Sequence, residues 1–391
     1  MKTNYFFLVM ALCCMSCAQK TSKEQAGSNT EIPNDTSTYY GIKNNIIPVD
    51  FDKPEVLSVF DYFKSVELIP LETGEDVLIG QLQKIIHYQD RYYTLDRQQH
   101  IVHVFDETGK FVFKIDRRGQ GPGEYPSLDD IHISRFTDHL ELLCAMGFVY
   151  EYDLSGEFIE MTRVTNEYLR AVHECISLDK NTILFFAAFH HPYRLVYYDR
   201  HKQQIIHEDF EESDILGAMF NYSSFYRYND NWYFYRPFCQ EVYKLEKNRM
   251  KTAYTWDFGK FNRDFRETHF SVAAQNNPYT RFDEISAQIP YWLLETGENN
   301  RFVISRIKIN GEFANLIYDK SIQQSKYIPH FTESVDILPL TVTNEYVLSY
   351  CNPSELEQYV TEDMLDDESR KVFNELIHAD ANPVILKYHF K

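Results

Sequence analysis

The segment Val104-Phe105-Asp106-Glu107-Thr108-Gly109-Lys110-Phe111 is echoed 47 residues later by Glu151-Tyr152-Asp153-Leu154-Ser155-Gly156-Glu157-Phe158. In both segments an aromatic residue precedes an acidic turn residue, and a glycine follows it. Weaker copies end at Asp199 and Leu245, so the four turn positions recur at steps of 47, 46 and 46 residues. A period of about 40–50 residues, built from aromatic and β-branched strands, is typical of the blades of a β-propeller.

A second series of turns indicates the number of blades. Six times along the chain, a polar turn residue precedes an alternating strand. These turn residues are Asp90, Asp138, Asn181, Asn231, Asn300 and Asn344. Because this is the pattern of a half-buried strand, the sequence predicts an all-β fold, a six-bladed β-propeller. An open solenoid is the alternative.

The two ends of the propeller sequence predict how the ring closes. Val384–Phe390 has the pattern of a third strand in blade six, and no fourth strand follows it. Val66–Leu71, which precedes blade one, has strand character. We expect this N-terminal segment to be the missing outer strand, because that pairing leaves no long open edge.

Charge and cysteine usage exclude some classes of protein. The formal net charge of −19 predicts repulsion from phosphate backbones, so no nucleic-acid partner is expected. Beyond the first 17 residues, four cysteines occur one per predicted blade: Cys144, Cys175, Cys239 and Cys351. A disulfide needs Cα atoms about 4.4–6.8 Å apart, which separate blades seldom allow. We therefore expect buried thiols.

The first residues resemble the leader of a bacterial lipoprotein. The apolar run Tyr5–Met15 is too short to span a bilayer and ends in Cys14-Met15-Ser16-Cys17. Cys17 is the expected lipidated residue, although Cys14 stands where such leaders usually have leucine. The predicted domains are a signal peptide at 1–17, a flexible tether at 18–45 and the propeller at 46–391. An ordinary secretory signal is the alternative.

The loop Arg117–Tyr125, which follows the first repeat segment, looks like that of six-bladed β-propeller lipoproteins of Gram-negative gut-type bacteria. These proteins are related in pattern to NHL-repeat propellers. Asn382–Leu386 and Ile69–Glu72 also match the pattern, so the resemblance covers roughly residues 45–391. It implies the fold and a location in the cell envelope as an outer-membrane lipoprotein, with the periplasmic or surface face undecided. It supplies no ligand and no catalytic residues.

Five unusual loops map to one rim of the predicted propeller. They are the Gly-rich loop 117–125, the turns 190–193 and 236–238, and the inserts 259–286 and 353–382. Binding residues tend to lie on loops held by a rigid scaffold. The predicted ligand-binding residues are Arg117, Arg118, Glu124, Tyr125, His190, His191, Tyr193 and Arg236.

These loops also have structural interpretations. Gly119-x-Gly121-x-Gly123 could hold a phosphate, but a strand and not a helix follows it, which favours a turn that needs positive φ. His190-His191 has no acidic residue nearby, so no metal site is predicted. Insert 353–382 has apolar residues at helical spacing and predicts one or two amphipathic helices, which either cover a central pocket or only pack on the rim.

No linear catalytic motif occurs, so catalytic residues are unknown and no cofactor is predicted. We expect a non-enzymatic envelope protein that touches the membrane only through its lipid and binds a glycan, a peptide or a partner protein. The alternative is a lyase or hydrolase acting on a sugar derivative or lactone in the central channel. Three or more converging carboxylates or histidines would favour the enzyme.

Overall fold

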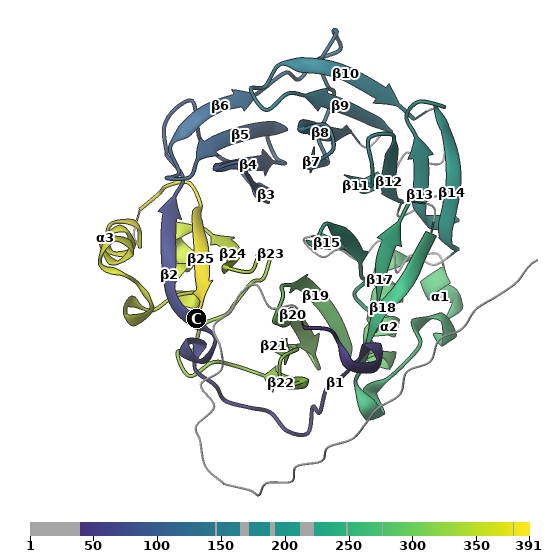
Figure 1. Cartoon of the computed structure of the whole chain (residues 1–391), viewed down its shortest axis with the longest axis vertical. Helices are drawn as coiled ribbons and strands as arrows, with labels where there is room; N and C mark the ends of the chain where they lie inside the picture. Colours follow the sequence, from purple (N-terminus) through teal and green to yellow (C-terminus); the bar gives the residue numbers. More distant parts are fainter. Residues whose placement is uncertain are drawn as a thin grey trace, which may run out of the picture. The chain divides into compact units, whose positions relative to one another are not determined.

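Six antiparallel sheets lie around a central axis and form the blades of a β-propeller (Figure 1). The computed structural model describes residues 40–144, 147–164, 172–187, 192–211, 223–247, 249–275, 277–377 and 379–391. The predicted fold class and blade number are therefore confirmed. The expected lipidation site Cys17 and residues 18–39 of the expected tether lie outside the described residues.

The strands of each blade run in order from the axis outwards. Blade one contains β3 (Leu82–Tyr88), β4 (Arg91–Asp96), β5 (Ile101–Asp106) and β6 (Phe111–Ile115). Blade two contains β7 (Asp130–Ser134), β8 (His139–Cys144), β9 (Phe148–Tyr152) and β10 (Phe158–Arg163). Blade three contains β11 (Val172–Ser177), β12 (Thr182–Ala187), β13 (Tyr193–Asp199) and β14 (Gln204–Glu211).

The remaining blades follow the same plan. Blade four contains β15 (Phe225–Tyr228), β16 (Asn231–Phe234), β17 (Glu241–Glu246) and β18 (Arg249–Asp257). Blade five contains β19 (Tyr291–Glu298), β20 (Phe302–Ile309), β21 (Glu312–Asp319) and β22 (Gln324–Ile328). Blade six contains β23 (Thr341–Val342), β24 (Tyr346–Cys351), β25 (Val384–Phe390) and β2 (Phe63–Pro70).

The ring closes as the sequence predicts. β2 pairs antiparallel with β25 from Phe63 opposite Phe390 to Pro70 opposite Val384. An N-terminal strand thus completes the last blade. A second N-terminal strand, β1 (Ile46–Pro48), was not predicted; it pairs parallel with β18 and extends blade four to five strands. Just before β1, the backbone N–H of Tyr40 donates to the Asn300 carbonyl (3.3 Å).

The repeated turns have a local chemical cause. Asp153 Oδ1 accepts hydrogen bonds from the N–H and hydroxyl of Ser155 (2.8 and 2.6 Å) and from the N–H of Glu157 (3.0 Å). Gly156 has φ of +89°, a conformation that costs glycine little. Asp106 makes the same set of bonds in blade one. The turn is therefore specified by residues no more than four positions apart.

The hydrophobic core is divided among the blade interfaces. In the described part of the chain, six clusters of buried apolar side chains lie between neighbouring blades. Cys144, Cys175, Cys239 and Cys351 are buried free thiols, as predicted.

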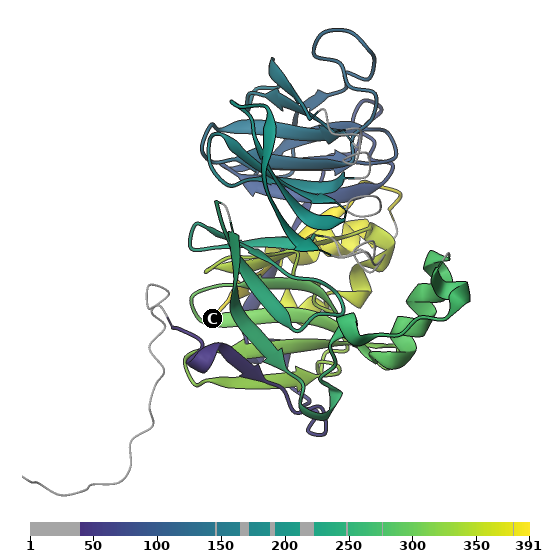
Figure 2. The same cartoon turned by 90° about the vertical axis from the view of Figure 1, so that its right-hand side faces the viewer.

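Both inserts lie on one side of the ring. Insert 259–286 forms two 3₁₀ turns and the helices α1 (Val272–Gln275) and α2 (Pro278–Gln288). Insert 353–382 forms two 3₁₀ turns and α3 (Asp367–Leu376), whose Ser369 hydroxyl accepts from the N–H of Leu68 in β2 (3.1 Å). Figure 2 shows α1 and α2 on the side of the ring away from the first described residues, which are drawn in purple. The helical insert of the last blade is thus present and packs on the closing strand.

Candidate functional site

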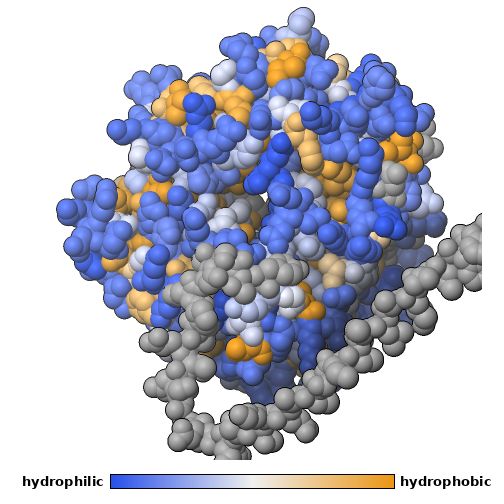
Figure 3. All heavy atoms as spheres, viewed as in Figure 1, coloured by the Kyte–Doolittle hydropathy of each residue, from blue (hydrophilic) through white to orange (hydrophobic). Residues whose placement is uncertain are grey.

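The six innermost strands enclose a cavity of about 460 Å³ on the axis of the ring. Every blade contributes to its wall, through residues that include Lys84, His132, Glu174, Arg227, Glu298 and Thr341. Asn229, Asn299 and Asn344 also line it, and they lie in the turns between first and second strands. In each blade these turns lie at the end of the strands opposite the loops that hold the two inserts. The face of the ring shown in Figure 3 is largely hydrophilic and is hollowed near its centre. The cavity therefore reaches the face opposite the inserts.

Two arginines and two aromatic rings lie at the mouth of this cavity. Arg135, in the turn after β7, has its guanidinium carbon 5.7 Å from the centre of the Tyr88 ring. Arg227, on β15, lies 5.9 Å from the centre of the Trp232 ring and donates to Asp230 (2.7 Å). Burial, and then the positive charge of Arg135, lower the pKa of Arg227. The mouth thus combines positive charge with flat apolar surfaces.

His132 lies deeper, on β7, and is only 6% exposed. Its ring centre is 5.3 Å from that of Trp232, and the residue lines the cavity. Burial lowers the pKa of His132 well below its usual value, and the nearby cations Lys84 and Arg200 lower it further. The ring is therefore neutral at pH 7 and offers one donor and one acceptor to the cavity. As a polar ring in the cavity wall, His132 suits contact with a bound molecule.

A buried ion-pair cluster forms the inner end of the cavity. Lys84 Nζ lies 2.7 Å from Asp130 and 3.5 Å from Glu174. Burial opposes the charge on Lys84, but the two carboxylates outweigh it and raise the pKa of Lys84. Burial also raises the pKa of Asp130, with a further contribution from Glu174. Glu174 in turn accepts from the Ser224 N–H (2.9 Å), so the cluster joins blades one to four.

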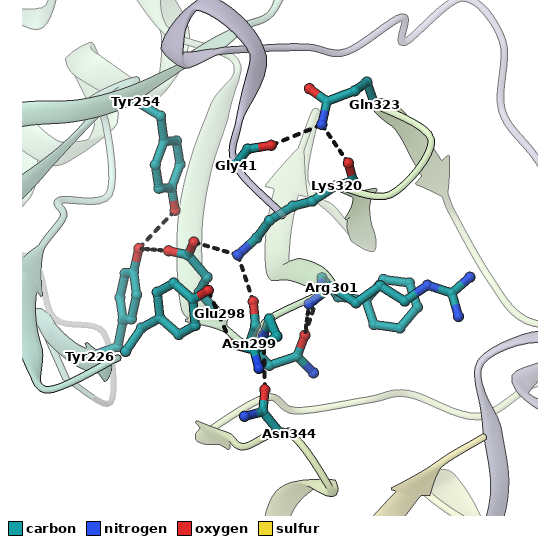
Figure 4. A network of polar contacts seen from close by, with 12 residues as sticks. Gly41, Tyr226, Tyr254, Glu298, Asn299, Arg301, Lys320, Gln323 and Asn344 are labelled. Atoms are coloured by element: carbon teal, nitrogen blue, oxygen red, sulfur yellow. Dashed lines mark hydrogen bonds and ion pairs between the residues drawn. The ribbon is translucent and has the colours of Figure 1, made fainter. Parts of the chain in front are cut away.

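A second buried network forms the wall on blades four and five (Figure 4). Glu298 accepts from Lys320 Nζ (2.7 Å) and from the Tyr226 hydroxyl (3.1 Å), which also contacts the Tyr254 hydroxyl (3.0 Å). Burial raises the pKa of Glu298 and lowers that of Lys320. Lys320 also donates to the carbonyl of Asn299 (2.5 Å). These contacts hold the carboxylate of Glu298 rigidly beside the cavity.

None of the described residues predicted from the rim loops lines this cavity. Tyr125 is fully buried, and its hydroxyl donates to the carbonyls of His100 (3.0 Å) and Ile115 (2.9 Å), which fastens the Gly-rich loop to blade one. Glu124 accepts from the N–H of Gly121 within the loop (2.8 Å). Arg117 lies 3.5 Å from Glu157, and Arg118 is exposed. In this loop only Gly123 has positive φ, +72°.

The other predicted residues are separated from these. Arg236 is buried between the rings of Phe210 and Phe265, 3.9 and 4.2 Å from their centres. Tyr193 is half-buried at the start of β13. His190 and His191 lie outside the described residues. The structure therefore does not bring the described rim residues together into one site.

The cavity residues were missed because they are spread over all six blades, which are far apart in the sequence. A local signal was nonetheless present: Ile131-His132-Ile133 and Val172-His173-Glu174 place polar residues inside apolar first strands. Such residues face either the axis or a neighbouring blade, and the sequence does not say which. The six first strands meet only when the ring closes, so the sequence also does not show which polar residues come together.

Two features are absent from the described part of the chain. No three histidine, cysteine or acidic side chains gather there in a way that could hold a metal ion. None of the helices there has the length and hydropathy needed to cross a membrane.

Comparison with known proteins adds a family and a fold. No curated protein matches the chain significantly. Among solved structures, a Bacteroides fragilis NCTC 9343 protein described as a putative exported protein is similar, with 18% sequence identity and a TM-score of 0.66. The match covers 88% of this chain and 99% of the Bacteroides fragilis chain. A DUF4221 member from Bacteroides vulgatus ATCC 8482 shares 11% identity, with coverages of 84% and 98% and a TM-score of 0.50. At these identities the likenesses show the fold alone.

The family described as "Domain of unknown function (DUF4934)" matches residues 44–389, which is nearly the whole described propeller. The chain therefore belongs to the DUF4934 family.

Proposed function

We propose that this protein is an exported binding protein that takes a small ligand into the mouth of its central channel. The observation that carries the proposal is the 460 Å³ cavity with the buried ring of His132 in its wall. Its volume falls in the range of about 300–1,000 Å³ typical of small-molecule sites. Of the three expected partner classes, a glycan unit or a peptide end suits such a cavity better than a folded protein.

Export and anchoring are part of the proposal. The leader that ends at Cys17 supports export, and so does the similar Bacteroides fragilis protein that is described as exported. In this proposal Cys17 carries the lipid, residues after it form a tether, and the propeller lies at the outer membrane. The net charge of −19 agrees with a partner other than nucleic acid.

A ligand screen tests the binding proposal. The mature protein is screened by thermal unfolding against neutral hexoses, uronic acids, amino acids and dipeptides. A ligand that binds only the folded state raises Tm. We expect at least one of these groups to do so, and isothermal titration then gives its affinity.

Two matched variants place the binding in the cavity. Thr341→Trp fills the mouth, since Thr341 lines it on β23, whereas Thr252→Trp puts the same ring on the exposed outer strand β18. Binding should disappear in the first variant and persist in the second. The proposal is wrong if no group of the panel binds, or if Thr341→Trp binds as well as the unaltered protein.

A further inference from the structure

The mouth of the cavity contains hydrogen-bond donors without partners. Arg135 has no ion pair to a described residue. The Nε of Arg227 is buried and likewise has no hydrogen-bond partner there. With the ring of His132, three groups from blades two and four line the same space and carry N–H donors. A buried donor without a partner is unfavourable, so the Nε of Arg227, together with the exposed guanidinium of Arg135, favours an acceptor-rich ligand.

The charges around the cavity indicate how many negative charges that ligand carries. Lys84 lies beside two carboxyl groups, Glu174 and Asp130, and burial raises the pKa of Asp130 to about 7, so that Asp130 is partly protonated at neutral pH. Lys320 is paired with Glu298. Arg227 is paired with Asp230. Arg135 alone among the described cations of the mouth has no carboxylate within ion-pair distance. A single negative charge therefore suits the mouth, whereas a dianion would meet repulsion from the carboxylates deeper in the cavity.

The other surfaces of the mouth indicate what carries the charge. The rings of Tyr88 and Trp232 are half-buried and present flat faces beside the two guanidiniums. Thr341 and Asn344 are exposed polar residues on the blade-six part of the wall. A ring with an apolar face and hydroxyl groups on its edge matches both kinds of surface.

From these observations we infer that the mouth of the channel binds the carboxylate of a uronic acid, a sugar ring with one negative charge. Arg135 and Arg227 bind the carboxylate, Tyr88 and Trp232 pack on the ring, and His132 donates to or accepts from a ring substituent. Guanidinium groups suit a carboxylate because their paired N–H donors match its two oxygens. The inference rests on the proposed function, since it names the ligand of the same cavity.

Isothermal titration of the mature protein with matched sugars tests the inference. Galacturonate and glucuronate differ from galactose and glucose only at C6, so each pair isolates the carboxylate. We expect the uronates to bind at least tenfold more tightly, which corresponds to one charge-assisted hydrogen bond. Added salt should weaken uronate binding and leave hexose binding unchanged.

Variants then assign the carboxylate to its arginine. Arg135→Gln should lower uronate affinity at least tenfold without changing hexose affinity. Arg135→Lys keeps the charge but loses the planar fork. Its uronate affinity should therefore lie between that of Arg135→Gln and that of the unaltered protein. Arg249→Gln removes the same charge from an outer strand of blade four, where Arg249 is 72% exposed, and should bind like the unaltered protein. Arg135 is itself exposed, so its variants should fold; their Tm values verify this.

The outcomes separate the two proposals. If the hexoses bind as tightly as the uronates, or if Arg135→Gln has no effect on uronate, the inference is wrong while binding in the cavity still stands. Tighter binding of benzoate or inorganic phosphate than of either uronate also overturns it, because the charge would then not be carried by a sugar ring. If no sugar and no other ligand binds, both proposals fall.

Discussion

Asp153 shows how much a single side chain contributes to this fold. One carboxylate oxygen organises the whole turn between β9 and β10 by accepting three hydrogen bonds. The hydroxyl of Ser155, followed by backbone N–H groups, lowers the pKa of Asp153. Because all partners lie within four residues, the turn leaves a visible pattern in the sequence. This explains why the repeat, and with it the blade number, could be predicted from sequence.

Arg236 illustrates the opposite case. Its sequence context, Arg236-Pro237-Phe238, reads as an exposed turn on a binding rim. In the structure Phe210 and Phe265 enclose its guanidinium from both sides. These partners belong to β14 and to the insert after blade four, so no local sequence pattern predicts that Arg236 is buried. A residue whose role depends on distant segments cannot be interpreted from its neighbours in sequence.

His103 leads to a prediction about pH. It is buried in β5, and burial lowers its pKa to about 4, from an ordinary value of 6.5. Between pH 6.5 and 4 the unfolded chain binds a proton that the folded chain does not, so stability falls as pH falls through this window. At pH 5 this single group lowers the free energy of unfolding by roughly 2 kcal/mol.

His103→Gln should therefore lose less stability than the unaltered protein between pH 7.5 and pH 5. Urea unfolding gives the free energy of unfolding of each protein at pH 7.5 and at pH 5. Because each protein is compared with itself, any loss of stability that the substitution causes equally at both pH values cancels. His173, whose pKa is also lowered to about 4 by burial, leaves part of the pH dependence in place. Equal losses in the two proteins would contradict the prediction.

At the scale of elements, the pairing of β2 with β25 is the contact that closes the ring. It was predictable because the last blade lacked a fourth strand and a strand-like segment preceded the first. β1 was not predictable in the same way: three residues, Ile46–Pro48, are too short to show a strand pattern. They are held by β18, whose position is known only once blade four is formed.

Removal of the closing strand should prevent cooperative folding. A chain that begins at residue 72 lacks β2 and leaves the edge of β25 open, and open edges promote association. A chain that begins at residue 50 lacks only β1 and is the control. We expect the shorter chain to elute as aggregates and to unfold without a sharp transition, while the control stays monodisperse. A monodisperse shorter chain with an unchanged urea midpoint would show that β2 is dispensable.

For the whole molecule, the sequence predicted the scaffold, but its candidate binding residues lie on the rim loops and do not line the cavity. Loops that interrupt the repeat are conspicuous in a sequence, whereas Lys84, His132 and Glu174 each lie within a regular strand. They become a site only because six first strands converge on one axis (Figure 1). The geometry of closure, and not any local motif, therefore creates the candidate site.

The anchoring proposal also concerns the whole molecule. Cys17→Ala should prevent lipidation and move the protein from the membrane fraction to the soluble envelope fraction or the medium. Labelling with a radioactive fatty acid, followed by fractionation, measures both effects. Cys13→Ala, in the same leader, is the matched control and should remain labelled. Membrane association of the unlabelled Cys17→Ala protein would contradict a lipid anchor at this position.

The pairing of β2 with β25 also has a consequence for the timing of synthesis. Glu67 and His389, which lie 3.1 Å apart across this pair, are separated by 322 positions in the chain. At about 5–20 residues per second, the ribosome needs roughly 15–60 s to travel that distance. Throughout this time β2 has been made but has no partner, and every blade before the last can form first. The ring is therefore completed only at the end of synthesis, and a chain that lost its final strand would carry an open edge on both β2 and β24.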